Sequence, residues 1–492
     1  MNLRKLLEPL ITYKVVGEIN IDINDIKVDS RKVEHGNLFI CLPGSSSDGH
    51  DYAKQSVENG AVALICENEL PINIPQVIVK NSRFAMALLT DKFYNHPSHK
   101  LKVIGITGTN GKTTTTYLIE KILADQNHLS GLIGTIRMKI GNEIINVKNT
   151  TPDANDLHNY FNKMVEVGSE YAILEVSSHA LDMGRVKGVD FNIAVFTNLT
   201  QDHLDYHGTM DKYREAKGLL FSRLGNVYFN NSNSKFAVLN ADDDASQYFN
   251  KITAVQVITY GIDNDADVKA TNINITGQGT SFTLISFKGK IDINLKMIGK
   301  FSVYNALGAI AVALIEGIAL ENIKHSLEEI SGVDGRFELV NANQDYTVIV
   351  DYAHTPDGLE NVLKTIKEFA KRKVYCVFGA GGDRDKSKRP LMGKIALNYS
   401  DLAIITSDNP RTEDPEQIIK DILEGIITEE NRSKYITIQD RKKAIEYAVN
   451  NARSGDVIII AGKGHENYQI LNDKVIHFDD REVALEAIRS KL

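Results

Sequence analysis

The stretch VIGITGTNGKTTTT, from Val103 to Thr116, decides how the rest of the chain is interpreted. Its first residues are apolar and rich in β-branched side chains, which is typical of a buried strand, and a glycine-containing turn follows. A helical pattern continues from Tyr117. A strand, a glycine turn and a helix in this order form a cradle whose backbone N–H groups bind phosphate. Lys112 can then reach the outer phosphates, and the Thr113 hydroxyl can bind Mg²⁺.

The match to the phosphate-loop pattern G-x-x-x-x-G-K-[ST] is incomplete, because Ile106 stands at the position of the first glycine. An ordinary glycine-rich turn between a strand and a helix is the alternative. We favour a nucleotide phosphate site, because Gly-Lys-Thr directly after a strand satisfies the mechanism as well as the pattern.

The composition is that of an ordinary globular protein, with 42% hydrophobic and 24% charged residues. A length of 492 residues predicts about three domains. The net charge of -8 argues against nucleic acid or an anionic membrane as the main partner. The cysteines are far apart and form no C-x-x-C pair, so neither disulfides nor a zinc site is predicted. No signal peptide or membrane span is recognised, and we expect a cytoplasmic protein.

Two further strand patterns of the same region end in polar residues. The apolar run Tyr171–Leu174 ends at Glu175, and the run Asn192–Phe196 leads into a polar segment that contains His203. Because parallel α/β sheets bind ligands beyond the carboxyl ends of their strands, we expect Glu175 and His203 to face the phosphate loop. Their donor atoms suit Mg²⁺ or Mn²⁺, although either residue alone would be an ordinary surface carboxylate or a hydrogen-bonded histidine.

Lys217 interrupts an apolar helical stripe. It shares a helix face with Met210, Tyr213, Leu220 and Phe221, at spacings of three and four. The side chain could extend its ammonium to solvent, or it could be partly buried with a lowered pKa and a reactive neutral amine. The pattern leaves both interpretations open.

The last third of the chain repeats one design, a buried strand that ends in charged or turn-forming residues. Four such strands, with helices between them, predict a doubly wound sheet whose strand ends form a concave charged site. The predicted strands are Thr347–Val350, Val374–Phe378, Leu402–Ile405 and Val457–Ile460.

The sequence resembles the Mur ligases of bacterial cell-wall synthesis, and among them those that add the third residue of the muramoyl peptide. The segments that carry the resemblance follow in the family's order through nearly the whole chain. They are residues 107–113, which also explain the departure at Ile106, and residues 149–152, 175–179, 198–207, 351–356 and 408–411.

The resemblance implies an α/β fold of three domains. Residues 1–98 would form a small α/β domain that holds the nucleotide sugar. Residues 99–332 would form a central P-loop ATPase domain around a parallel sheet. Residues 333–492 would form a mobile, Rossmann-like, doubly wound domain that binds the amino acid.

The resemblance also assigns site residues. ATP would be bound by Gly108, Thr109, Asn110, Gly111, Lys112, Thr113, Thr114, Asn305, Arg336 and Asp351. Mg²⁺ would be bound by Thr113, Glu175, His203 and a carbamylated Lys217. Among these, Lys112, Lys217 and His203 would be catalytic. The muramoyl substrate would be bound by Ser30, at its uridine end, and by Asn149, Thr150, Thr151, Ser177 and Arg185. The amino acid would be bound by Arg384, Asp408, Asn409, Pro410, Arg411, Gly462 and Glu466.

The activity implied is ATP-dependent amide formation through an acyl phosphate. The partners would be small molecules, namely the UDP-N-acetylmuramoyl dipeptide and the incoming amino acid. We expect no nucleic-acid partner, no membrane insertion and a monomer.

Arg411 bears on which amino acid is added. A guanidinium in a pocket can grip a carboxylate with two parallel hydrogen bonds, and meso-diaminopimelate carries one more carboxylate than lysine. Arg411 therefore favours diaminopimelate, with Arg384 available for a carboxylate and Glu466 for an ammonium. The alternative is that Arg411 pairs with Asp408 or Glu413 as part of the loop scaffold.

Three rival functions remain. A lysine-adding ligase of the same family differs least from a diaminopimelate-adding one. A folylpolyglutamate synthetase shares the ligase scaffold, but such enzymes begin near the phosphate loop and lack the long N-terminal segment. A P-loop switch that hydrolyses ATP without amide formation would leave the charged rim of the last third unexplained.

Overall fold

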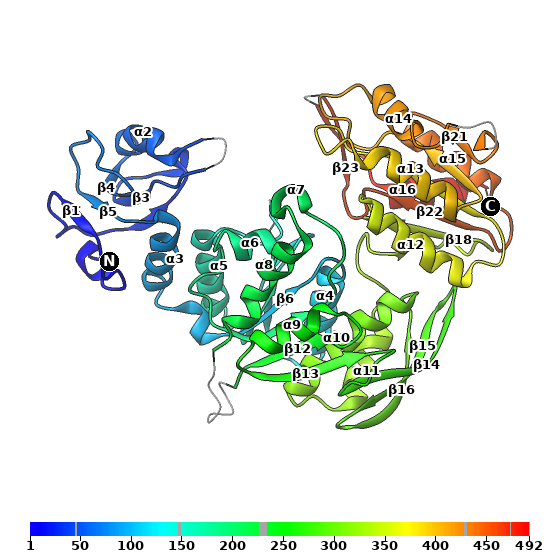
Figure 1. Ribbon diagram of the computed structural model, residues 1–492, viewed down its shortest axis with the longest axis horizontal. Coiled ribbons are helices and arrows are strands. Elements are labelled where there is room, and N and C mark those ends of the chain that lie inside the picture. Colours follow the sequence, from blue (N-terminus) through cyan, green and yellow to red (C-terminus); the bar gives the residue numbers. More distant parts are fainter. Residues whose placement is uncertain (45–46, 146–148, 226–233, 428–430, 473, 492) are drawn as a thin grey trace.

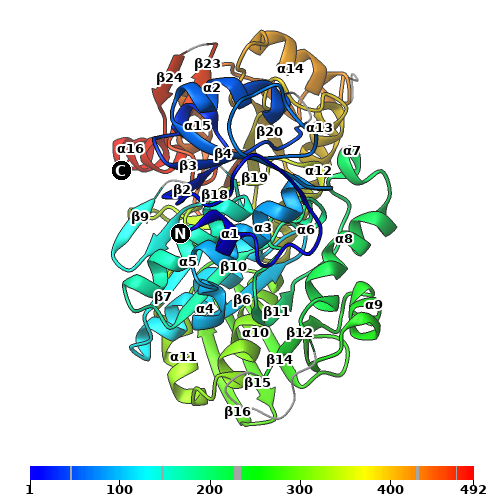
Figure 2. The same cartoon turned by 90° about the vertical axis from the view of Figure 1, so that its left-hand side faces the viewer.

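The structure is a computed structural model that describes residues 1–44, 47–145, 149–225, 234–427, 431–472 and 474–491. Figure 1 shows three α/β units, with the N-terminal and C-terminal units on opposite sides above the central one, and Figure 2 shows the same central unit beneath both. No helix in the described residues is long and apolar enough to cross a bilayer.

The N-terminal unit contains one small sheet. Its described strands follow the order β1-β5-β4-β3-β2, and the β1–β5 pair is antiparallel while the other pairs are parallel. The strands are β1 (Lys14–Val16), β2 (Asp25–Lys27), β3 (Asn37–Ile40), β4 (Ala61–Cys66) and β5 (Gln76–Ile78). The helices are α1 (Leu3–Leu6), α2 (Ala53–Glu58) and α3 (Ser82–Phe93), with 3-10 turns η1 (Ser30–Lys32), η2 (Gly49–Tyr52) and η3 (Pro97–Lys100).

The central unit is built on a long sheet of order β16-β15-β14-β13-β12-β11-β6-β10-β7-β8-β9 in the described residues. Its strands are β6 (Lys102–Thr107), β7 (Ser130–Ile133), β8 (Met138–Ile140), β9 (Glu143–Ile145), β10 (Tyr171–Glu175), β11 (Phe191–Phe196), β12 (Phe236–Asn240), β13 (Gln256–Gly261), β14 (Val268–Thr276), β15 (Gly279–Ser286) and β16 (Gly289–Leu295). Its helices are α4 (Lys112–Asp125), α5 (Ala154–Glu166), α6 (Ser178–Asp182), α7 (Leu204–His207), α8 (Met210–Ser222), α9 (Ala245–Ile252), α10 (Lys300–Ile315) and α11 (Leu320–Glu329).

The expected parallel sheet is only the middle of this one. The strands from β14 to β7 pair in parallel, whereas β14–β15–β16 and β7–β8–β9 pair antiparallel. The physical reason is visible in burial, because β6 is buried along almost its whole length, while the later residues of β14 alternate between exposed and partly buried. Alternation is typical of hairpins with one solvated face.

The C-terminal unit confirms the predicted doubly wound sheet. The strand order is β17-β18-β22-β19-β20-β21, and among the described strands of this sheet only the β17–β18 pair is antiparallel. The strands are β17 (Glu338–Leu339), β18 (Thr347–Asp351), β19 (Val374–Phe378), β20 (Leu402–Ile405), β21 (Tyr435–Thr437) and β22 (Val457–Ala461), with a separate hairpin of β23 (Tyr468–Leu471) and β24 (Lys474–His477).

Helices cover both faces of this sheet. One apolar core lies under α12 (Pro356–Phe369), α13 (Lys388–Tyr399) and α14 (Pro415–Leu423). The other lies under α15 (Arg441–Asn451) and α16 (Asp480–Lys491). Alternate residues of one strand serve the two cores, since Cys376 of β19 lies in the first and Val377 in the second.

A fully buried ion pair ties α15 and α16 to the sheet. The Arg441 guanidinium donates to both carboxylate oxygens of Asp480, at 2.7 and 2.6 Å, and to the backbone oxygen of Ala461 at 3.0 Å. Neither side chain of the pair is exposed to solvent. Ala461 is the last residue of β22, so the pair also fixes the end of that strand.

We therefore expect Arg441→Met to destabilise the C-terminal unit by about 3–5 kcal/mol, because Asp480 would stay buried without its cation. The double substitution Arg441→Met with Asp480→Leu should recover part of this loss, because it removes the unpaired charge. Thermal unfolding, with hydrogen exchange in α15 and α16, measures both variants. Equal stability of Arg441→Met and the native chain would contradict the interpretation.

Candidate active site

The phosphate loop has the geometry predicted from the sequence. Strand β6 ends at Thr107, and helix α4 begins at Lys112 after a turn in which Gly111 has φ +84°. A Cβ atom at Gly108 would lie 1.9 Å from Thr197 Oγ1, and one at Gly111 would lie 2.3 Å from Asn305 Oδ1. Both positions therefore need glycine, because neighbouring segments close on the loop.

Two lysines donate to one carbonyl of this loop. Lys112 Nζ lies 2.8 Å from the backbone oxygen of Gly108 and 2.8 Å from that of Thr109. Lys217 Nζ, from α8, lies 2.9 Å from the same Gly108 oxygen. Two ammonium groups thus meet at the centre of the loop, where an anion would be strongly favoured.

Lys217 is buried, so its ammonium does not extend to solvent, which was one of the two interpretations left open by its helical pattern. Its side chain is 1% exposed, and its ammonium lies 4.3 Å from the centre of the Tyr213 ring. Burial, followed by repulsion from Lys112, holds the pKa of Lys217 well below its usual range. The neutral amine is therefore easier to form than in an ordinary, solvent-exposed lysine.

Segments that follow β11 hold the phosphate loop in place. Asn110 N donates to Asn198 Oδ1 at 2.9 Å, and Thr197 Oγ1 donates to the Asn110 backbone oxygen at 2.6 Å. Thr109 Oγ1 lies 3.2 Å from the Tyr213 hydroxyl and accepts from Thr200 N at 3.0 Å. These hydrogen bonds attach the phosphate loop to the residues that follow β11 and to α8.

Glu175 lies beside the loop, as predicted. Its fully buried carboxylate accepts hydrogen bonds from the hydroxyls of Thr113, at 3.1 Å, and Thr135, at 2.9 Å. Thr135 N donates to the other carboxylate oxygen at 2.9 Å. Carboxylate and hydroxyl oxygens converge here, and such oxygens are the ligands that Mg²⁺ prefers.

His203 lies in a group of aromatic side chains. Its backbone has φ +53°, and its ring centre lies 4.7 Å from that of His179. Burial lowers the pKa of His203, so the neutral imidazole predominates near neutral pH. In the described part of the chain, no three His, Cys, Asp or Glu side chains are grouped closely enough to hold a metal ion.

The residues predicted for the muramoyl substrate gather next to Glu175. Thr151 Oγ1 donates to the Glu175 backbone oxygen at 2.8 Å and accepts from Ser177 N at 3.0 Å. Arg185 Nη1 donates to the Thr151 backbone oxygen at 3.1 Å. Thr150 Oγ1 lies 3.1 Å from Thr135 Oγ1, which connects it to the same carboxylate.

Asn149 and Ser30 make none of the contacts just described for that group. Asn149 precedes Thr150 in the chain and is exposed. Ser30 lies in the N-terminal unit, where its hydroxyl donates to Gln55 Oε1 at 3.0 Å and its backbone oxygen accepts from Asn59 Nδ2 at 2.9 Å. Ser30 is therefore engaged within its own unit.

Arg336 brings the C-terminal unit to the phosphate loop. Its Nη2 lies 3.5 Å from Thr113 Oγ1, and its guanidinium lies 4.7 Å from the centre of the Tyr352 ring. Asp351 accepts from the backbone N–H groups of Phe337, at 2.7 Å, and Ala353, at 2.8 Å. Both carboxylate oxygens of Asp351 thus hold the backbone around Arg336.

Asn305 and Thr114 complete the predicted nucleotide set. Asn305 lies in the second turn of α10, and its Oδ1 accepts from Thr115 Oγ1 at 3.4 Å. Thr114 is buried in the first turn of α4.

Asp357 was missed by the sequence analysis. Its Oδ2 accepts from Asn110 Nδ2 at 3.1 Å and from Thr200 Oγ1 at 2.9 Å, so a carboxylate of α12 contacts the phosphate loop. The available signal was its place directly after residues 351–356, a segment already singled out.

The residues predicted for the amino acid lie at the ends of three neighbouring strands. Asp408 and Asn409 follow β20, Gly462 and Glu466 follow β22, and Arg384 follows β19 between them. Asn409 Nδ2 donates to Glu466 Oε2 at 2.9 Å. A Cβ atom at Gly462 would lie 3.0 Å from Asp408 Oδ2, so this glycine lets the two strand ends approach.

Arg411 is held in a strained backbone conformation. Its φ is +52°, its N–H donates to the Ile470 oxygen at 3.2 Å, and its own oxygen accepts from Asn472 N at 2.8 Å. Strain of this kind is found most often at functional sites. Pro410, which precedes it, is buried.

The Arg411 guanidinium donates to the Gly382 backbone oxygen at 2.7 Å and, among the described ion pairs, has no carboxylate partner. The scaffold alternative required Asp408 or Glu413. Glu413 instead pairs with Arg389 at 2.9 Å, and Asp408 pairs with Lys463 at 3.4 Å. The other guanidinium donors of Arg411, together with the nearby Arg384, are thus available to a ligand carboxylate.

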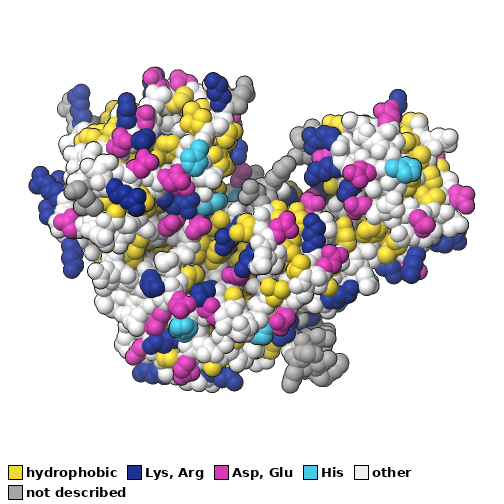
Figure 3. Space-filling model, turned by 180° about the vertical axis from the view of Figure 1, so that it is seen from behind, with side chains coloured by type: hydrophobic (Ala, Val, Ile, Leu, Met, Phe, Trp, Pro, Cys, Tyr) yellow, Lys and Arg dark blue, Asp and Glu magenta, His cyan; other side chains and the backbone are white. Residues whose placement is uncertain are grey.

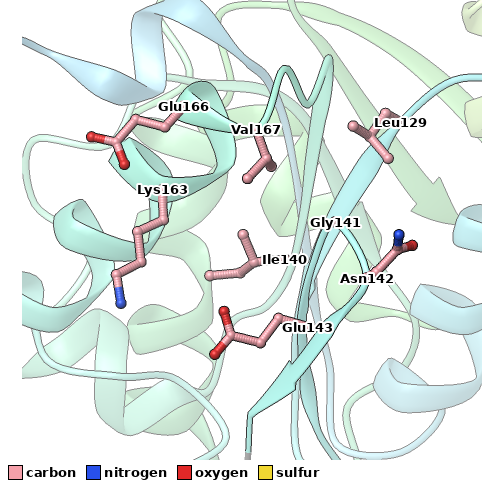
Figure 4. Close-up of a pocket in the computed structure, with 8 residues that line it drawn as sticks. All are labelled: Leu129, Ile140, Gly141, Asn142, Glu143, Lys163, Glu166 and Val167. Carbon is pink, nitrogen blue, oxygen red and sulfur yellow. The ribbon is translucent and has the colours of Figure 1, made fainter.

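A separate hollow lies between the β8–β9 hairpin and the end of α5 (Figure 4). None of the predicted site residues lines it, and it is open to solvent. Its lining residues are Leu129, Ile140, Gly141, Asn142, Glu143, Lys163, Glu166 and Val167.

Comparison with known proteins matches three family descriptions in chain order. They are the Mur ligase family catalytic domain at residues 22–93, the Mur ligase middle domain at 106–313, and the Mur ligase glutamate ligase domain at 335–464. A MurF ligase of Thermotoga maritima, solved in complex with ADP, shares the fold at 19% identity and a TM-score of 0.65, covering 95% of this chain and 96% of its own.

Full-length relatives are much more similar. The UDP-N-acetylmuramoyl-L-alanyl-D-glutamate–2,6-diaminopimelate ligase of Bacillus cereus is 53% identical over 492 residues, covering 100% of this chain and 99% of its own. The ligase of the same name from Halalkalibacterium halodurans is 53% identical over 491 residues, with coverages of 100% and 99%. A solved ligase of that name is 34% identical with a TM-score of 0.72, again covering 100% and 99%. The chain therefore belongs to the Mur ligase family.

Proposed function

We propose that this protein joins meso-diaminopimelate to UDP-N-acetylmuramoyl-L-alanyl-D-glutamate with consumption of ATP, as a step of peptidoglycan precursor synthesis. The observation that carries the choice of amino acid is Arg411, whose guanidinium lies at the strand ends without a carboxylate partner among the described residues. The relatives from Bacillus cereus and Halalkalibacterium halodurans, named for this reaction, support it over the whole chain.

The reaction would proceed in two steps. The γ-carboxylate of the D-glutamate residue attacks the γ-phosphate of ATP, an acyl phosphate forms and ADP leaves. The amine of diaminopimelate then attacks the acyl carbon, a tetrahedral intermediate collapses and phosphate departs. All groups of the first step are anionic, so the protein's contribution is mainly positioning and positive charge.

Each part of the site has a place in this scheme. Residues Gly108 to Thr114 would hold the phosphates, and Lys112 would leave its contact with Gly108 to neutralise them. Glu175 and Thr113 suit Mg²⁺, with His203 and a carbamylated Lys217 as further proposed ligands; the ion would supply positive charge at the phosphates. Asn149, Thr150, Thr151, Ser177 and Arg185 would hold the peptide, and Ser30 the uridine end.

The amino-acid pocket and the phosphate loop belong to different units, so the C-terminal unit has to approach the central one during turnover. Figure 3 shows a broad notch between the two upper lobes of the molecule. Arg336 and Asp357 already contact the central unit. We propose that these two side chains keep contact with the phosphate loop when the units close. Domain limits at 98 and 332, a monomeric state and a cytoplasmic location belong to the same proposal.

The rival functions are less well supported. A folylpolyglutamate synthase of Mycobacterium tuberculosis, 17% identical with a TM-score of 0.62, covers 92% of its own length but 77% of this chain, so it shares the fold while nearly a quarter of the chain has no counterpart. A lysine-adding ligase remains the closest rival, and the choice between the two amino acids is open to direct test.

Diaminopimelate should be used in strong preference to lysine, because binding lysine would leave Arg411 without the carboxylate that it grips. The loss should be about 2–5 kcal/mol, which is on the order of 30-fold to several thousand-fold in kcat/KM. Arg411→Ala should abolish most of this preference, while Arg453→Ala, at an exposed arginine of the same unit, should keep it. The measurement is amino-acid-dependent phosphate release with the UDP-muramoyl dipeptide. Equal use of lysine by the native protein would refute the choice of amino acid.

Lys112→Ala should reduce ATP-dependent turnover to background, because the phosphates would lose the ammonium at the start of α4. Lys121→Ala, on the same helix but paired with Asp125 and Glu329, is the matched control and should retain turnover. Phosphate release and circular dichroism test both variants. Near-normal turnover by a folded Lys112→Ala protein would rule out the phosphate-loop assignment.

Lys217 should act as a carbamate, formed when its neutral amine adds to carbon dioxide with release of one proton. Because burial and Lys112 lower the pKa of Lys217, the reactive amine is present at lower pH than for an ordinary lysine. Lys217→Ala should lose activity and regain part of it with a short-chain carboxylic acid, whereas exposed Lys212→Ala should need no rescue. A free amine in active, metal-bound enzyme, observed crystallographically, would contradict this expectation.

A further inference from the structure

Lys463 is a buried lysine in the amino-acid pocket, where it is paired with Asp408. It follows β22, between Gly462 and Glu466, and its side chain has no solvent exposure. Its ammonium donates to Asn409 Oδ1 at 2.9 Å and to the Tyr468 backbone oxygen at 2.6 Å. Asn409 is one of the residues predicted for the pocket, and Tyr468 begins β23.

Two carboxylates flank the same ammonium. Lys463 Nζ lies 3.4 Å from Asp408 Oδ1 and 3.8 Å from Glu466 Oε2. Burying an ammonium costs several kcal/mol, and an uncompensated one would not be retained in this position. Asp408 and Glu466 therefore compensate Lys463, and Lys463 in turn compensates two acidic groups that would otherwise repel each other.

The ammonium also determines how Asn409 is oriented. Lys463 has only donors, and the backbone N–H of Ile470 also points at Asn409 Oδ1, at 3.0 Å. The amide oxygen of Asn409 must therefore face these two donors. Its NH₂ group is left to face Glu466, and it donates to Glu466 Oε2 at 2.9 Å. One carboxylate oxygen of Glu466 is thereby fixed through Asn409.

The charge balance points in the same direction. Burial and the neighbouring Asp408 raise the pKa of Glu466, and Lys463 opposes them. Burial also acts to raise the pKa of Asp408, but the charges of Lys463 and Arg441 outweigh it and lower that pKa. Without Lys463, at least one of the two carboxylates would be protonated more readily and would attract a cation less strongly.

We propose that Lys463 is the positioning residue for the ammonium-binding side of the amino-acid pocket. It orients Glu466 through the Asn409 amide and keeps Asp408 and Glu466 together as carboxylates that face an ammonium of the incoming diamino acid. This role rests on the proposed function, because it requires a substrate that carries an ammonium remote from the reacting amine. Arg411 grips the carboxylate of that same end of the substrate, so the two residues divide one zwitterionic group between them.

The first test is Lys463→Met, which keeps most of the side-chain volume and removes the charge. The KM for diaminopimelate should rise by about tenfold or more, because a hydrogen-bonded charge of the pocket is lost. A tenfold rise corresponds to about 1.4 kcal/mol. The KM values for ATP and the UDP-muramoyl dipeptide should change by less than about twofold. Lys235→Met is the matched control. Lys235 is also buried and is ion-paired with Asp190, but it lies in the central unit, directly before β12.

A double-mutant cycle with Glu466→Gln separates positioning from general stability. If Lys463 acts through Glu466, the rise in KM for the double variant should be clearly smaller than the product of the two single effects. Asn409→Asp provides a second route should Lys463→Met fold poorly. It keeps an acceptor for Lys463 and removes the donor to Glu466, so it too should raise the KM for diaminopimelate selectively.

The inference is overturned if a folded Lys463→Met or Asn409→Asp protein keeps the native KM for diaminopimelate, if all three KM values rise together, or if the single effects multiply in the cycle. Failure of the proposed function is a different result, namely that the native protein does not use diaminopimelate. If it used lysine instead, the same comparison would be made with lysine, whose ε-ammonium places the same demand on Glu466.

Discussion

Parallel pairing of strands with flush ends is the constraint on which the rest of this structure depends. In the central sheet, Glu175 of β10 pairs with Ile106 of β6, and Phe196 of β11 pairs with Thr107. The three strands therefore end at one edge, and the residues that follow them have to meet there. The C-terminal sheet obeys the same rule, since Asp351 and Phe378 both pair with Ala461. Ligand sites at the carboxyl ends of parallel strands follow from this geometry.

Charged side chains gather at each of these edges. At the central edge, two ammonium groups donate to the Gly108 oxygen, and burial together with their mutual repulsion lowers the pKa of Lys217. At the C-terminal edge, Arg411 donates to a backbone oxygen at 2.7 Å, while Asp408 and Glu466 share Lys463. The first arrangement suits phosphates and the second suits a group with both a carboxylate and an ammonium.

Polar side chains connect the two edges. Arg336 reaches Thr113 at 3.5 Å, and Asp357 accepts from Asn110 and Thr200. Asp351 holds the residue next to Arg336, because its carboxylate accepts from Phe337 N as well as from Ala353 N. Apolar contacts lie beside these polar ones, because Ile298 is part of the C-terminal core and the Phe301 ring lies 5.2 Å from that of Phe337. The proposed reaction, whose components lie on separate units, requires these units to move relative to one another.

The sequence by itself determined the phosphate loop, the four strands of the last unit and the set of polar strand ends, because apolar runs and glycine positions are local signals. Tertiary structure decided the rest. The antiparallel hairpins at both ends of the central sheet, the common contact of Lys112 and Lys217, and the position of Asp357 depend on pairing between distant segments. The burial of Lys217 and the freedom of Arg411 from Asp408 and Glu413 were likewise decided by packing, because a side chain's solvent exposure and its ion partners depend on elements far away in the chain.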